Sequence, residues 1–95
     1  MSDVRLVLPG ALAEVAGGSR TLTVALPGDA TVRDVLDDLA GRLPALERRI
    51  RDEQGALRRH VCLYVDGADV RLADGLDTPL PAGAELLVLP SVAGG

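Results

Sequence analysis

The spacing of apolar residues changes twice along this chain of 95 residues. Apolar residues first alternate with other residues over 4–8 and 22–26, which predicts two strands with one buried face each. They then recur at every third or fourth position over 32–43, which predicts an amphipathic helix. Alternation returns over 61–65 and 85–89. This order indicates an α+β fold, in which a mixed sheet of about five strands packs on one main helix.

Turn-forming residues divide the strands. Gly17-Gly18-Ser19 predicts a longish loop that joins the first two strands as a hairpin. Asp66-Gly67 predicts a tight turn, after which Ala68 to Leu72 should return as a short strand. Pro90 stops the last strand. The sequence therefore predicts one domain over 1–90 and a flexible tail over 91–95.

The helix has a start signal and a stop signal. Thr31 is a good N-cap residue, and Asp34 lies three residues later, near the positive end of the helix dipole. Pro44 stops the helix, and Ala45 to Ile50 predict a short second helical turn. Leu80 is expected to fill the core beneath a later turn, together with Leu76.

The composition excludes several functions. The chain has no Lys, Phe or Trp and only one Tyr, so it has no amine for Schiff-base chemistry and no aromatic platform for nucleic acid. Its net charge of −4 also argues against binding to a phosphate backbone. One Cys cannot form an internal disulfide, and no run of apolar residues is long enough to span a membrane. We therefore expect a cytoplasmic protein that binds neither nucleic acid nor membrane.

The chain ends in Ser91-Val92-Ala93-Gly94-Gly95. Residues without a Cβ atom can pass through a narrow channel and adopt conformations that other residues cannot. A terminal carboxylate held in this way can be adenylated and then attacked by a sulfur donor, which gives a thiocarboxylate. That chemistry needs no side chain of this protein, and the sequence shows no convincing catalytic or metal-ligating set.

Several segments of the second half, in this order, resemble the ThiS/MoaD-type sulfur carriers of the ubiquitin-like superfamily. The resemblance implies a ubiquitin-like β-grasp fold. The segments that carry it are Tyr64-Val65-Asp66-Gly67, Asp69-Val70-Arg71, Gly75-Leu76-Asp77-Thr78-Pro79-Leu80, Gly83-Ala84-Glu85, and Leu89-Pro90 through Gly95.

The resemblance also implies a mechanism. An adenylyltransferase/sulfurtransferase of the ubiquitin-activating type would use ATP to activate Gly95, and Ser91, Val92, Ala93 and Gly94 would thread into its channel. The chain would then be a carrier and co-substrate, not an enzyme, and would bind no cofactor itself.

Asp69-Val70-Arg71 and the ending resemble most the actinobacterial carriers for cysteine synthesis. That branch implies a PLP-dependent cysteine synthase as sulfur acceptor and a peptidase that releases cysteine. Enzymes of molybdopterin synthesis or of sulfur-containing natural-product pathways are other candidates to receive the sulfur. The alternatives are a ubiquitin-like modifier joined to lysines of other proteins, a molybdopterin-synthase small subunit, and a β-grasp module whose tail is incidental.

Four apolar residues fall on the strand parity opposite to the expected core, where a one-sided sheet should be polar. They predict an exposed docking patch for partner proteins, although part of the set could pack under a loop. These residues are Val7, Tyr64, Leu87 and Leu89.

Two further clusters have an ordinary interpretation. Cys62 and His60 share a strand face, but no third residue orients them, which favours a small buried or half-buried Cys over a catalytic dyad. Asp34, Asp37 and Asp38 could suggest a cation site, but their helical spacing favours a solvated face.

Arginines are concentrated over 42–59, where six stand against three carboxylates, a formal charge of +3 that leaves −7 for the rest of the chain. This segment is either an ordinary solvated surface or a docking face for an acidic partner.

Overall fold

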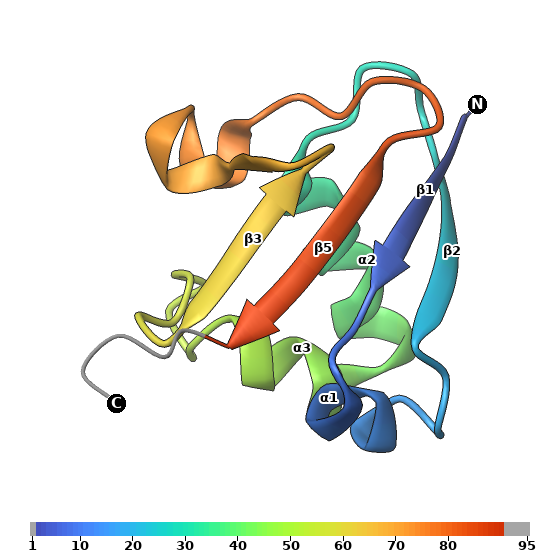
Figure 1. Ribbon diagram of the computed structural model, residues 1–95, viewed down its shortest axis with the longest axis vertical. Helices are drawn as coiled ribbons and strands as arrows, with labels where there is room; N and C mark the ends of the chain where they lie inside the picture. Colours follow the sequence, from blue (N-terminus) through green and yellow to red (C-terminus); the bar gives the residue numbers. More distant parts are fainter. Residues whose placement is uncertain (1, 91–95) are drawn as a thin grey trace.

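A computed structural model describes residues 2–90 of the chain. It contains a five-stranded sheet in the order β2-β1-β5-β3-β4, with β1 and β5 parallel and the other neighbours antiparallel (Figure 1). The sheet is therefore mixed, as the sequence predicts, and the last strand lies at its centre. The strands are β1 (Ser2–Val7), β2 (Thr21–Leu26), β3 (Val61–Val65), β4 (Ala68–Asp69) and β5 (Glu85–Pro90).

The long helix packs on one face of this sheet, and the first short helix lies at one end of it (Figure 1). Within residues 2–90, the sheet is accompanied by three helices and two 3₁₀ turns. They are α1 (Gly10–Val15), α2 (Val32–Arg42) and α3 (Pro44–Ile50), with two short 3₁₀ turns, η1 (Val70–Leu72) and η2 (Gly75–Asp77), after β4. The apolar stripe of α2 is fully buried against inward residues of the three central strands. This core contains Val32, Val35, Leu36 and Leu39 of α2 and Leu6, Leu63 and Leu86 of the sheet. Leu80 is buried and Leu76 is partly buried against the same core, as expected.

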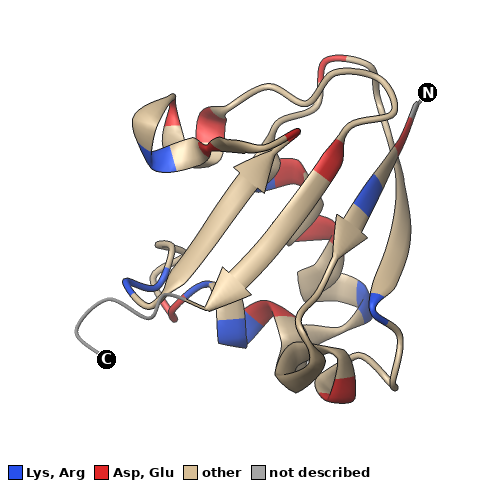
Figure 2. Ribbon diagram, viewed as in Figure 1, with Lys and Arg blue, Asp and Glu red and all other residues tan. Residues whose placement is uncertain are grey.

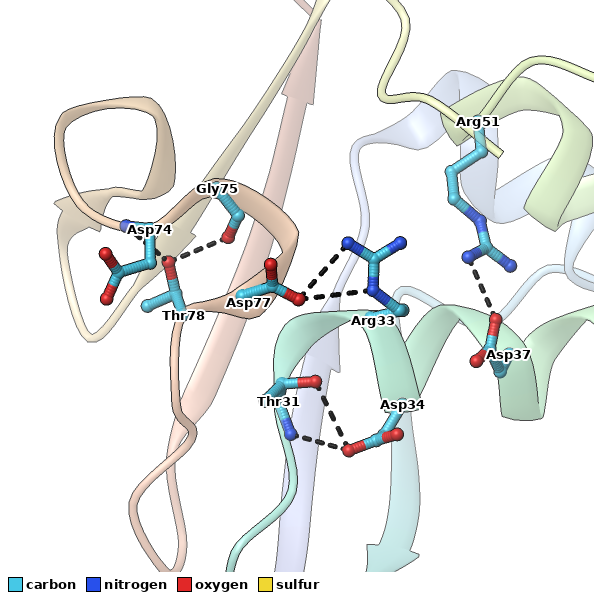
Figure 3. Close-up of polar contacts among 9 residues, drawn as sticks. All are labelled: Thr31, Arg33, Asp34, Asp37, Arg51, Asp74, Gly75, Asp77 and Thr78. Atoms are coloured by element: carbon cyan, nitrogen blue, oxygen red, sulfur yellow. Dashed lines mark hydrogen bonds and ion pairs between the residues drawn. The ribbon is translucent and has the colours of Figure 1, made fainter. Parts of the chain in front are cut away.

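The start of α2 is capped as the sequence predicts. The Asp34 carboxylate accepts hydrogen bonds from the Thr31 backbone N–H at 2.8 Å and from the Thr31 hydroxyl at 3.2 Å (Figure 3). The carboxylate also lies beside the positive end of the helix dipole.

We expect Asp34→Ala to lower the free energy of unfolding by about 1 kcal/mol, because it removes both the cap and the dipole interaction. That corresponds to a fall of about 4–8 °C in melting temperature for a domain of this size. Glu53→Ala, in an exposed loop, is the control and should melt with the wild type. Equal melting temperatures for the two variants would show that the cap does not stabilise the fold.

Two local predictions are wrong. Residues 10–15 form α1, where a longish loop was expected; at six residues the helix is too short to show a period, and it has no side-chain cap. Residues 70–72 form a 3₁₀ turn instead of continuing the strand, because the Asp69 carboxylate accepts a hydrogen bond from the Arg71 backbone N–H at 2.9 Å and turns the chain.

Within residues 2–90, no helix is both long and apolar enough to cross a membrane.

Candidate functional site

The chain leaves the body of the protein from the middle of the sheet. β5 ends at Pro90, which pairs with Val61 at the start of β3. The tail therefore begins beside the loop that leads into β3, at the end of the sheet near α1 and α3 (Figure 1). The residues expected to be activated and threaded, Ser91, Val92, Ala93, Gly94 and Gly95, lie outside the described residues, so their roles stay predictions.

The sheet face opposite the helices carries the four apolar residues of the expected docking patch. Leu87 pairs with Val7 on one side and with Tyr64 on the other, so these three form one row across β1, β5 and β3. Leu89 lies further along β5 toward the tail, opposite Cys62, and is 37% exposed. Val7, Tyr64 and Leu87 are half-buried. The structure thus brings all four together on one surface that leads to the tail.

A small apolar pocket lies where the tail begins, and the sequence did not predict it. It has a volume of about 180 Å³, and α1 forms one of its walls. Because residues 10–15 were expected to be a loop, nothing in the sequence pattern placed them beside the end of β5. The lining residues are Pro9, Ala11, Leu12, Arg49, His60, Val61, Leu89 and Pro90.

Arg71 holds the start of β3 in place. Its Nη1 donates to the Val61 carbonyl at 2.7 Å and its Nη2 donates to the Arg58 carbonyl at 2.8 Å. Both carbonyls belong to the segment beside the start of the tail. The motif Asp69-Val70-Arg71 therefore has a structural role: Asp69 turns the chain, and Arg71 fastens the turn to the segment that enters β3.

Cys62 and His60 show no dyad geometry. Cys62 is half-buried, with its Sγ 3.9 Å from Nη1 of Arg71, and His60 is exposed on the wall of the apolar pocket. No hydrogen bond joins the two side chains in the part of the chain that the structure describes. This arrangement fits the interpretation of Cys62 as a small half-buried side chain.

The three aspartates of α2 have separate roles. Asp34 caps the helix and Asp37 accepts from Nη1 of Arg51 at 2.9 Å (Figure 3). Asp38 accepts from Nε of Arg42 at 2.8 Å. Across residues 2–90, no group of three or more metal-ligating side chains gathers in one place.

The arginine-rich segment divides into paired and unpaired members. Arg42 pairs with Asp38, and Arg51 pairs with Asp37 and with Glu47, whose carboxylate lies 2.8 Å from Nε of Arg51. Burial lowers the pKa of Arg51, but its hydrogen bonds to Glu47 and Asp37 and their negative charges outweigh burial and raise the pKa overall. Among the described residues, the other four have no carboxylate within ion-pair distance: Arg48, Arg49, Arg58 and Arg59.

Comparison with known proteins adds a family match. The model of the ThiS family matches residues 6–95, which include the terminal glycines. The small archaeal modifier protein 1 of Haloferax volcanii is 45% identical over 84 residues, covering 88% of this chain and 91% of that protein. Its crystal structure superposes with a TM-score of 0.82, covering 99% of this chain and all of the other.

Sulfur carriers also match. The sulfur carrier protein CysO of Mycobacterium tuberculosis is 34% identical over 95 residues, covering 98% of this chain and 99% of that protein. A chain from the BexX/CysO complex of Amycolatopsis orientalis is 34% identical, with a TM-score of 0.79 and coverage of 97% of this chain and 99% of the other. These folds identify the sheet and its helices as the ubiquitin-like β-grasp expected from the sequence.

Proposed function

Because the chain belongs to the ThiS family of small ubiquitin-like carriers and modifiers, we propose that it is a sulfur carrier that acts through Gly95. The observation that carries this proposal is the position of the terminal glycines. Only three residues separate them in the sequence from Pro90, where the central strand of the sheet ends, and the family match extends to the last residue. The curated relatives are themselves small carrier or modifier proteins, which supports a role as co-substrate and not as enzyme.

The proposed chemistry takes place on the backbone. The Gly95 carboxylate attacks the α-phosphorus of ATP in the active site of a ubiquitin-activating-type adenylyltransferase, and pyrophosphate leaves. Hydrosulfide then attacks the acyl carbon, and AMP leaves. A thiocarboxylate is left on the carrier. ATP and reduced sulfur are both required, so we place the protein in the cytoplasm.

The direct test is reconstitution. The full chain is mixed with ATP, sulfide and the adenylyltransferase from the same host, and its intact mass is measured. We expect an increase equal to the mass difference between sulfur and oxygen, located at Gly95 by fragmentation. The proposal fails if the carrier keeps its original mass while the enzyme activates another carrier in the same mixture.

The proposed recipient is a PLP-dependent cysteine synthase. Similarity to CysO over nearly the whole chain supports this choice, as does the Asp69-Val70-Arg71 motif. A peptidase would then release cysteine from the terminus. Incubation of the thiocarboxylate form with the host synthase and an O-activated serine should convert it into a form extended by one cysteine residue: the thiocarboxylate sulfur bonds to the serine β-carbon as the activated oxygen leaves, and the acyl group then moves from sulfur to the amine. That product distinguishes this recipient from molybdopterin or natural-product enzymes.

We further propose that partners dock on the row formed by Val7, Leu87 and Tyr64. Leu87→Asp should weaken the adenylyltransferase complex by about 30-fold or more, because it places a charge at the centre of an apolar contact. Thr23→Asp is the matched control, since Thr23 is exposed on β2 on the same face of the sheet. Binding measured by calorimetry should be near wild-type for the control. Equal binding by the two variants would exclude this row as the docking surface.

A second candidate function is protein modification. The 45% identity to a small archaeal modifier protein favours it specifically. Chemically, only the acceptor differs: a lysine amine attacks the activated Gly95 in place of sulfide. Because this chain contains no lysine, it cannot form lysine-linked chains of itself. Branched glycine remnants on lysines of other host proteins, lost on deletion of its gene, would support this function.

A further inference from the structure

The two ends of the sheet differ in charge (Figure 2). Asp66 follows β3 and Glu85 begins β5, so both lie at the end away from the tail. At the end where the tail begins, Arg49, Arg58 and Arg59 lie beside the start of β3 and on α3. A molecule of net charge −4 thus presents a basic surface at the end from which its tail leaves.

These arginines are available to a partner. Arg49 and Arg59 are exposed, and neither has a carboxylate within 4 Å among the described residues. Arg58 is held in position, because its Nε donates to the Arg48 carbonyl at 2.7 Å and its own carbonyl accepts from Arg71. Glu14 on α1 and Glu53 in the loop after α3 are exposed carboxylates on neighbouring segments.

The apolar pocket adjoins this basic surface. Arg49 and His60 line the pocket together with Leu12, Val61 and Leu89. Its volume of about 180 Å³ suits one aliphatic side chain. Basic side chains and an apolar pocket therefore lie side by side. We call this the tail-root surface, which consists of the pocket and of Arg49, Arg58, Arg59 and His60.

We infer that the tail-root surface binds an acidic protein segment that carries an aliphatic side chain, on the partner that receives the tail. The aliphatic side chain would enter the pocket, and flanking carboxylates would pair with Arg49 and Arg59. Nucleic acid fits less well, because the chain as a whole is acidic and only 1% of its residues are aromatic. The identity of the partner rests on the proposed function, but the chemistry of the surface does not.

The charge arrangement gives this surface a second role. An acidic partner attracts the basic end and repels the acidic end, so the molecule approaches with its tail directed toward the partner. At low ionic strength, association should therefore be faster than for a carrier that has the same net charge spread evenly over its surface.

The surface can be tested without any sulfur chemistry. The isotopically labelled full chain is titrated with the peptide acetyl-Glu-Glu-Leu-Glu-Glu-amide and followed by NMR. We expect shifts concentrated at Leu12, Arg49, His60 and Val61. They should be lost in about 0.5 M NaCl, where charges are screened within a few ångströms. A peptide with Gln in place of each Glu should bind at least about fivefold more weakly.

Two variants with equal charge change locate the effect. Arg49→Gln/Arg59→Gln should weaken peptide binding about fivefold or more. Arg5→Gln/Arg33→Gln, which removes two arginines paired with Glu85 and Asp77 outside the tail-root surface, should leave it unchanged. The inference is overturned if both variants bind equally, if an oligothymidylate binds more tightly than the peptide, or if deletion of residues 91–95 alone reproduces the shifts, which would make the chain's own tail the occupant.

Measurements of association and adenylation with the host adenylyltransferase distinguish this inference from the proposed function. With Arg49→Gln/Arg59→Gln, the association rate at low salt should fall about tenfold, while the rate of adenylation at saturating enzyme stays unchanged. If adenylation occurs but the association rate does not change, the inference is wrong and the function stands. If the wild type is not adenylated although the peptide binds as expected, the proposed function is wrong and the surface stands.

Discussion

Deletion of Gly95 is expected to abolish formation of the thiocarboxylate while leaving the fold intact. The shortened chain still ends in a glycine carboxylate, but that group is drawn back by about 3.3 Å, the length of one extended residue. A displacement of only about 1 Å in a reacting group can lower a rate about 100-fold, so we expect a loss of at least that size. Pyrophosphate release in a single turnover measures the activation step, and intact mass measures the product.

Gly94→Val is the companion to this deletion, because it keeps the length and adds a branched side chain next to the reacting residue. We expect it to be activated at least about 100-fold more slowly, since a Cβ atom restricts the backbone within a narrow channel. Asp29→Ala, in the exposed turn between β2 and α2, is the control and should be activated at the wild-type rate. All variants should melt at the wild-type temperature. Activation of the shortened chain at a near wild-type rate would contradict the assignment of Gly95 as the reacting residue.

The fold could be predicted from the sequence because its main elements show a clear period. The stripe from Val32 to Leu39 and the alternation around Leu6, Leu63 and Leu86 define which faces are buried, and the structure buries all of them. The outward parity of Leu87 could be predicted in the same way. Its neighbours in space could not, because the register that places Val7 and Tyr64 on either side depends on where β5 inserts in the sheet.

The candidate site was less predictable because it depends on short elements and on contacts between distant residues. α1 has six residues and no cap, so neither a period nor a start signal marks it, and the pocket beside Pro90 remained hidden. The role of Arg71 depends on carbonyl groups 10 and 13 positions away. Hydrogen bonds to backbone carbonyls leave no trace in the residue types of the acceptors, so sequence patterns cannot indicate them.

The roles of the individual arginines in the arginine-rich segment could not be predicted from the sequence either. Its charge could be counted in the sequence, but six arginines in one window look alike there. The structure separates them by burial: the Arg51 side chain is 8% exposed and is bound by two carboxylates, whereas Arg49 and Arg59 lie on the surface. Arg51 therefore stabilises the fold, whereas Arg49 and Arg59 are exposed and can bind a partner.

Arg51→Met should be strongly destabilising. Glu47 is only 7% exposed, so loss of the guanidinium would leave a buried carboxylate without a compensating charge. Breaking a buried pair in this way costs about 3–5 kcal/mol, a large part of the about 5–15 kcal/mol that stabilises a typical domain. We expect the melting temperature to fall by about 15 °C or more. Asp37 contributes little to this loss, because its side chain is 60% exposed and can be hydrated.

Two further variants identify the cause. Arg42→Met makes the same change at an arginine that is 53% exposed and paired with Asp38, so it should cost about 0.5 kcal/mol or less. Glu47→Leu/Arg51→Met removes both buried charges and should recover at least about half of the lost stability, since apolar side chains can replace a buried ion pair without net loss. Denaturant unfolding measures all three. If Arg51→Met costs no more than Arg42→Met, or if the double variant is less stable than Arg51→Met alone, the cost does not come from a buried uncompensated carboxylate at Glu47.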